Sequence, residues 1–269
     1  MKSNKPVRQH YVPKFILKNF ANTKNIISVF DKKNSKTFNS NIDNVFVEKN
    51  IYTVNNKFNI EQDYAKEETY FSNIIQTILT KNTMSYLSDE TKYDIMKFFI
   101  IQYFRTNKFR NLQEDILQNS LEKIFNICVE NKIPKQIEES IKIDIAKDFV
   151  KEENFKVMKE IIEKINILMQ NKKFYLLHND SSSFFISDNP IVINNQQSNL
   201  LGFKVPYIEI YLPISPTLAI MICDVNVCNL KDLTDIKIDI TTSQSLNKLQ
   251  LLNSSRYIAF EFNRNCKWD

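Results

Sequence analysis

The stretch SDETKYDIMKFFIIQYFRT, residues 88–106, predicts a helix that lies at the centre of the fold. Ser88 is followed by two acidic residues, Asp89 and Glu90, a pattern typical of a helix N-cap and first turn. From Ile95 to Phe104 apolar residues cover the helix nearly all round. A helix of that kind is buried, so we expect this one to form part of the core.

The periodicity of the sequence changes on both sides of this helix. Between 61 and 172 apolar residues recur every three or four positions, which predicts four or five helices. Short apolar runs separated by polar turns predict strands before residue 60 and after residue 173. We therefore expect an α+β fold, in which a mostly antiparallel sheet is built from N- and C-terminal strands and the helices form a central insertion.

The boundaries of this arrangement follow from the same patterns. No linker or repeat marks a division, so we expect a single domain, 1–269, that is strand-rich over 1–60, helical over 61–172 and strand-rich over 173–269. The strands expected are 26–30, a run near 38, 45–47, 51–54, 174–178, 183–187, 190–194, 208–213, 217–222 and 257–262. Short helices are expected over 12–20 and 243–252.

The composition excludes several familiar active sites. Gly202 is the only glycine of the 269 residues, whereas phosphate-binding loops and the Gly-x-Ser-x-Gly turn of many hydrolases need more than one. His10 and His178 are the only histidines, so zinc motifs with several histidines are excluded as well. We expect neither a metal nor another cofactor.

Charge and cysteine content favour a soluble cytoplasmic protein. The chain has 36 Lys and Arg against 31 Asp and Glu, and the lysines are scattered rather than clustered, which argues against a dedicated phosphate-binding patch. No apolar run is long enough to cross a membrane, and no apolar leader follows the first residues. The four cysteines are too few for a disulfide scaffold, so we expect reduced thiols.

Two polar residues lie within the apolar helix. Gln102 and Arg105 are three positions apart and share a face, so both need partners in the core. Arg105 holds either an internal carboxylate, for which Glu61 is the preferred candidate, or a ligand anion. Arg110, farther along, is interpreted as a solvated helix end.

Two further polar residues lie at rigid positions. His10 precedes Tyr11, Val12 and Pro13 at the start of a short helix, where it acts as a general acid or base or supports a turn. Asp188 lies in Ser187-Asp188-Asn189-Pro190, where the proline holds the preceding residue extended. Its carboxylate either takes part in catalysis or caps its own backbone.

These segments resemble a known family. His10-Tyr11-Val12-Pro13 and the later Asp188-Asn189-Pro190 resemble the HYVP and DNP motifs of domain of unknown function 4238. The segment from Gln102 to Arg110 resembles that family's Gln-x-x-Arg-Thr helix, with Asn107 where a proline is usual. The resemblance covers nearly the whole chain and implies that His10, Gln102, Arg105 and Asp188 act as a unit, but it implies no substrate.

Two functions from different classes are compatible with these residues. The first is a small hydrolase or nuclease-like effector in which His10 is the acid or base, Asp188 orients it or activates water, and Arg105 with Gln102 binds an anionic group such as phosphate. Tyr11, Glu61 and Asn189 are the further substrate contacts expected.

The second function is a non-enzymatic binding or structural module, of the kind found in defence or mobile-element cassettes, in which the same residues form a satisfied buried network. The partner expected in either case is a small molecule or a nucleic acid. A nucleic-acid binder that uses scattered lysines is a third alternative, and steep salt dependence of binding would identify it.

Overall fold

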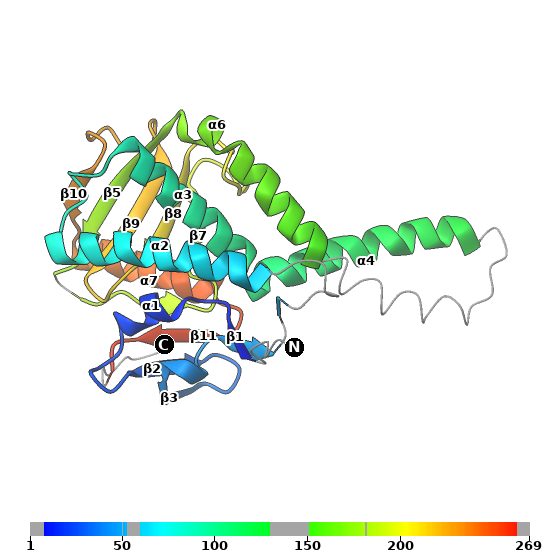
Figure 1. Cartoon of the computed structure of the whole chain (residues 1–269), viewed down its shortest axis with the longest axis horizontal. Helices are drawn as coiled ribbons and strands as arrows, with labels where there is room; N and C mark the ends of the chain where they lie inside the picture. The colour runs from blue at the N-terminus through cyan, green and yellow to red at the C-terminus, as the bar shows by residue number, and fades with distance from the viewer. Residues whose placement is uncertain (1–7, 50, 53–59, 130–150, 181, 263–269) are drawn as a thin grey trace.

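The computed structural model describes residues 8–49, 51–52, 60–129, 151–180 and 182–262, and of residues 61, 117–118 and 121–129 it describes the backbone alone. Its largest sheet has five strands, and helices cross one face of it (Figure 1). Neighbouring strands are antiparallel except for the parallel edge pair β10 and β5. In spatial order the strands are β10 (Thr234–Lys237), β5 (Lys172–His178), β9 (Leu218–Asp224), β8 (Ile208–Pro213) and β7 (Val192–Asn195).

A second sheet joins the two ends of the chain. Ile258 of its third strand is paired with Phe30 on one side and with Ser187 on the other, and all pairs are antiparallel. The expected sheet of N- and C-terminal strands is thereby confirmed. Its order is β3 (Lys36–Asn41), β2 (Ile26–Asp31), β11 (Tyr257–Phe260) and β6 (Ile186–Ser187), and a separate pair is formed by β1 (Arg8–His10) and β4 (Val47–Lys49).

Helices α2, α3, α4 and α6 lie between the N-terminal and C-terminal strands in sequence, as the expected insertion does, whereas α1 and α7 lie among those strands. Ser88 caps α3 by accepting a hydrogen bond from the backbone N–H of Thr91 at 3.2 Å. Helix α4 extends away from the rest of the described chain (Figure 1). The helices are α1 (Lys14–Lys18), α2 (Ile60–Lys81), α3 (Asp89–Phe104), α4 (Asn107–Val129), α6 (Ile165–Met169) and α7 (Ile240–Asn253), with a 3₁₀ turn, η1, at Ile42–Asn44 and a further helical stretch at 151–163.

The core is built around α3. Phe98 of α3 stacks on Phe71 of α2 with ring centroids 3.7 Å apart, and Phe15 of α1 packs on both rings. The same buried cluster includes residues of the five-stranded sheet such as Ile220, so one core connects the N-terminal, helical and C-terminal segments. The expectation that this apolar helix is central is confirmed, since eight of its residues are buried.

Several strands differ from the prediction; of the expected 183–187 only Ile186–Ser187 is a strand, and of the expected 45–47 only Val47 is. Strands β1 and β10 were not expected, because their sequences, RQH and TDIK, together contain only one apolar residue. They are strands because they pair with β4 and β5. Of the strand expected at 51–54, Ile51 and Tyr52 form a turn, and 53–54 lies outside the described residues.

Within the described residues, no helix has the length and apolar character needed to cross a membrane.

Candidate functional site

Arg105 ends α3 and is fully engaged inside the protein, with a relative exposure of 2%. Its Nε donates to the hydroxyl of Tyr52 at 3.0 Å, its Nη1 to the carboxylate of Glu68 at 2.5 Å, and its Nη2 to the backbone oxygen of His10 at 2.6 Å. Desolvation opposes the charge, but Tyr52 and Glu68 outweigh it and raise the pKa of Arg105. The guanidinium therefore stays charged and binds groups of its own chain.

The carboxylate partner of Arg105 in the described structure is Glu68, on the same helix as the preferred candidate Glu61. Glu68 lies on α2 seven residues after Glu61, so the two share a helix face. Glu68 forms the ion pair with Arg105, and its side chain is 28% exposed. The side chain of Glu61 lies outside the described residues.

Gln102 and Gln9 fasten the same N-terminal segment. Gln102 is buried on α3, and its Nε2 donates to the backbone oxygen of Tyr11 at 2.9 Å. The Oε1 of Gln9 accepts from the backbone N–H of Tyr52 at 2.9 Å, while the Tyr52 hydroxyl donates to His10 O at 3.2 Å. Gln102 and Arg105 thus bind the main chain of His10 and Tyr11, at consecutive carbonyl groups.

The imidazole of His10 is held separately from that network. Its Nε2 lies 3.0 Å from the backbone oxygen of Ile42, so this nitrogen carries the proton and donates. Burial lowers the pKa of His10, and nearby Lys14 adds to this effect, although the hydrogen bond to Ile42 opposes it. His10 is consequently neutral near pH 7.

Asp188 is buried, with 1% exposure, and its carboxylate binds backbone groups. One oxygen accepts from the N–H of Ser255 at 2.8 Å, and the other accepts from Arg256 and Tyr257 at 2.7 and 2.9 Å. Desolvation raises the pKa of Asp188, against the lowering effect of these three donors. The carboxylate fixes the chain where β11 begins, which differs from the turn within its own segment that was one expectation.

Asn189 connects the same region to α4. Its Nδ2 donates to the backbone oxygen of Asn253 at 3.1 Å and to the hydroxyl of Ser255 at 2.9 Å. Its Oδ1 accepts from the backbone N–H of Lys108 at 3.1 Å, in the first turn of α4. Such an acceptor satisfies one of the N–H groups that a helix start leaves without a partner.

The expected site residues therefore form two clusters of side chains that hydrogen-bond to backbone segments. His10, Tyr11, Gln102 and Arg105 meet through the N-terminal main chain, whereas Asp188 and Asn189 bind the segment that leads into β11. Burial raises the pKa of Tyr11, and the negative charge of Asp188 adds to this effect. Both oxygens of Asp188 are engaged by backbone donors, and no hydrogen bond joins it to His10 among the described contacts.

A polar pocket lies beside the first cluster. It has a volume of about 200 Å³, and we name it the Asn154 pocket. Asn154 donates through Nδ2 to the backbone oxygen of Phe104, directly before Arg105, at 3.0 Å. The pocket is lined by Glu48 of β4, by Asn107, Arg110, Asn111 and Glu114 of α4, and by Lys151 and Asn154 of the helical stretch 151–163.

Two buried polar atoms in the pocket wall lack partners. The Oδ1 of Asn154, a residue that is only 7% exposed, and the Nε of Arg110 make no hydrogen bond within the described structure. Arg110 Nη2 donates to one oxygen of Glu48 at 2.9 Å, and Asn107 donates to the other at 2.5 Å. Both unpartnered atoms are covered from solvent, so another molecule reaches them only after a side-chain adjustment.

The interpretation of Arg110 as a solvated helix end was wrong. Its side chain is 15% exposed and forms an ion pair with Glu48. The sequence contains a signal for this, because the pocket-lining residues Asn107, Arg110, Asn111 and Glu114 have the spacing i, i+3, i+4 and i+7 of a helix face. That face is normally apolar when it packs against another helix, and here it is entirely polar.

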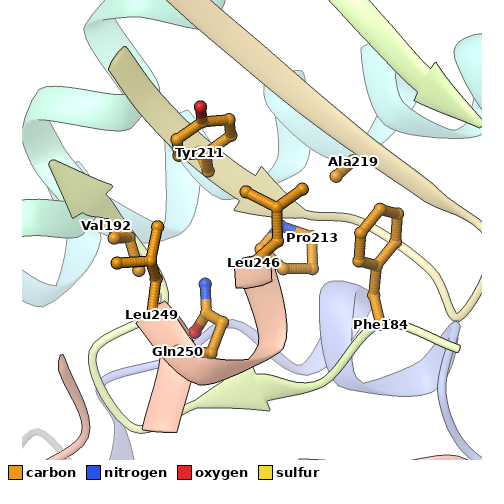
Figure 2. A pocket seen from close by; sticks show the side chains of 8 residues that line it. All are labelled: Phe184, Val192, Tyr211, Pro213, Ala219, Leu246, Leu249 and Gln250. Atoms are coloured by element: carbon orange, nitrogen blue, oxygen red, sulfur yellow. The ribbon is translucent and has the colours of Figure 1, made fainter. Parts of the chain in front are cut away.

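Two other cavities provide less for a ligand. In Figure 2, Leu246 and Leu249 of α7 face Tyr211 of β8 across a cavity of about 10 Å³, which has room for roughly one water molecule. A wider hollow of about 620 Å³ lies where β5 begins, with the ion pair of Lys172 and Asp224 in its wall, and it has no unpartnered buried side-chain atom among the described residues.

Metal ligands are also sparse. In the parts of the chain that the structure describes, no three His, Cys, Asp or Glu side chains gather in a group able to hold a metal ion.

These features define an α+β protein in which short polar motifs fasten backbone segments next to a polar pocket. The sequence matches the model of a family described as a protein of unknown function, DUF4238, over residues 8–262. The chain belongs to this family, and the resemblance seen in its motifs is confirmed at that level. Neither the curated proteins nor the solved structures compared with it gave a match.

Proposed function

We propose that this protein is a non-enzymatic binding module that takes a small polar molecule into the Asn154 pocket. The observation that carries the proposal is the unpartnered Oδ1 of Asn154, buried in the wall of a cavity of about 200 Å³. A buried acceptor without a partner costs about 1–3 kcal/mol. After the side-chain adjustment that uncovers these atoms, a ligand with a hydrogen-bond donor offsets that cost, and one that also has an acceptor satisfies Arg110 Nε as well.

The contacts of the motif residues support a binding role over hydrolysis. A catalytic acid or base must reach the proton that it transfers, and a phosphate-binding arginine must have free donors. Each nitrogen of the Arg105 guanidinium donates a hydrogen bond to Tyr52, Glu68 or His10, and both oxygens of Asp188 accept from backbone N–H groups. These residues fit a scaffold that positions the pocket.

The proposal includes a cytoplasmic location. The free thiols of Cys223 and Cys228 support it, because such thiols persist in reducing compartments.

The test is a binding screen with a matched pair of variants. Amino acids, sugars, nucleosides, organic acids and amines are added one by one to the full chain, and binding is followed by thermal shift and by amide NMR. Asn111→Trp fills the pocket from an exposed lining position, whereas Asn119→Trp places the same side chain on an exposed position of α4 outside the lining.

We expect at least one solute to bind the wild type and Asn119→Trp but not Asn111→Trp. If no solute perturbs the pocket, or if Asn111→Trp binds equally well, the proposal fails. If instead a bound solute is chemically consumed, and this activity disappears in His10→Ala, the hydrolytic function replaces it.

A further inference from the structure

We infer that the ligand of the Asn154 pocket is a small zwitterion that carries a carboxylate and an ammonium group, as a free amino acid does. The inference rests on the proposed binding function and specifies its ligand. It follows from the balance of charge, from the unpartnered donor and acceptor atoms of the wall, and from the size of the pocket.

The charged groups of the lining balance each other. Arg110 and Lys151 carry positive charge, and Glu48 and Glu114 carry negative charge, so the formal sum is zero. A nucleic acid or another polyanion requires an excess of cations, and its binding weakens steeply with salt. A zwitterion is neutral overall and has local charges of both signs, which match this lining.

Arg110 supplies a donor for a carboxylate. Arg110 keeps its Nη2 on Glu48 at 2.9 Å, while its Nε has no partner in the described structure. Lys151, on the helical stretch 151–163, is the second cation of the lining. Hydrogen bonds from a guanidinium to a carboxylate are charge-assisted and about twice as strong as neutral ones.

The other groups supply acceptors for an ammonium. Asn154 Oδ1 accepts no hydrogen bond among the described residues. The nitrogen of the same amide donates to Phe104 O. Glu114 contributes a carboxylate on the adjacent helix, one turn beyond Arg110 on the same face. A protonated amine has three donors and no acceptor, so it suits these oxygens.

The size of the cavity favours a ligand of few atoms. Its volume is about 200 Å³. For comparison, an apolar cavity of roughly 150 Å³ in another protein holds benzene. A short amino acid fits a space of this order, whereas a nucleotide or a peptide of several residues would have to extend outside it.

The experiment compares each zwitterion with its two halves. The twenty standard amino acids are titrated individually into the full chain, and the tightest binder is then replaced by its methyl ester, which lacks the carboxylate charge, and by its N-acetyl form, which lacks the ammonium. We expect each derivative to bind about tenfold more weakly or worse, a difference of roughly 1.4 kcal/mol.

Two variants test whether Glu114 binds the ammonium group of the ligand. Glu114→Gln should weaken binding of the amino acid about tenfold, and it should weaken binding of the methyl ester as well, because the ester keeps its ammonium group. Asp115→Asn changes the neighbouring carboxylate, which is exposed and outside the lining, and should leave the affinity unchanged. Circular dichroism at the titration temperature checks that both variants are folded.

The possible outcomes separate this inference from the binding function itself. If the N-acetyl form or the methyl ester binds as tightly as the amino acid, or if a sugar or nucleoside binds and no amino acid does, the zwitterion assignment is wrong but the binding module stands. If none of these solutes perturbs the amide resonances of Asn111 and Asn154, both proposals fail together. An unchanged affinity in Glu114→Gln overturns the role of that residue and the zwitterion assignment with it.

Discussion

Replacing Arg105 by methionine tests whether the motif residues hold the fold together. The change keeps a side chain of similar length but removes the charge and the hydrogen bonds to Tyr52, Glu68 and His10. Removing one partner of a buried ion pair typically costs about 3–5 kcal/mol. Two features place the cost near the lower end of that range.

The first feature is the exposure of Glu68, whose side chain is 28% exposed and so regains hydration when its partner is lost. The second is the hydroxyl of Tyr52, which already donates to His10 O at 3.2 Å and continues to satisfy that oxygen. We therefore expect a loss of about 3 kcal/mol, which in a protein of this size lowers the melting temperature by roughly 6–12 °C.

A matched control lies on the same two helices. Lys97 of α3 pairs with Glu67 of α2 at 2.7 Å, but the side chains are 28% and 33% exposed. Lys97→Met should cost less than about 1 kcal/mol, because exposed ion pairs contribute little. Urea unfolding of wild type, Arg105→Met and Lys97→Met measures the three free energies of unfolding.

The result that refutes the reasoning is an Arg105→Met protein as stable as Lys97→Met. Arg105 would then be no part of the scaffold, and a ligand-binding role for its guanidinium would have to be reconsidered. Arg105→Lys separates charge from geometry, since lysine keeps the charge but cannot bind in several directions with a rigid fork. It should fall between the wild type and Arg105→Met.

Two further predictions concern the other motif residues. Asp188→Asn puts an N–H₂ group against backbone donors, so at least one backbone N–H loses its acceptor. We expect the free energy of unfolding to fall by about 1–3 kcal/mol. The control Asp180→Asn, at an exposed position, should leave stability unchanged, and equal melting temperatures of the two variants would contradict the prediction. The pKa of His10 is lowered in the folded protein, so the unfolded chain takes up a proton more readily. The free energy of unfolding should therefore decrease as the pH falls below about 6.5, the pKa of a histidine in the unfolded chain. His10→Gln keeps a donor for Ile42 O and should flatten that decline in unfolding measured between about pH 7 and about pH 5, and an unchanged slope would count against it.

Much of the fold was predictable because its signals are local. The strand predicted at 208–213 coincides with β8, and the N-cap at Ser88 begins α3 as expected. Alternating or continuous apolar residues and capping side chains act within a few positions, so they appear in the sequence itself. Strands β1 and β10 were missed because their pairing depends on β4 and β5, which lie far away in the chain.

The burial of two motif residues was predictable but their partners were not, and the Asn154 pocket was not predicted. Burial of Gln102 and Arg105 follows from their place in an apolar helix, and the structure confirms that both are buried. Whether a buried arginine binds its own chain or a ligand depends on residues such as Tyr52 and Glu68, which lie 53 and 37 positions away. No periodicity in the sequence reports that distance, so both alternatives remained open.

An unusual polar residue in a core therefore marks a constrained position, and the distribution of its hydrogen bonds decides what the constraint is for. Arg105 and Asp188 have their groups satisfied by the chain, whereas Arg110 and Asn154 retain buried atoms that the described chain does not satisfy. The two sets are physically connected, because Asn154 holds Phe104 O at the end of α3, one residue before Arg105. A ligand that rotates the amide of Asn154 changes that hydrogen bond. Binding in the pocket and the anchoring of α3 therefore depend on the same side chain. Under the proposed binding function, the motif residues act on the pocket through the position of this amide.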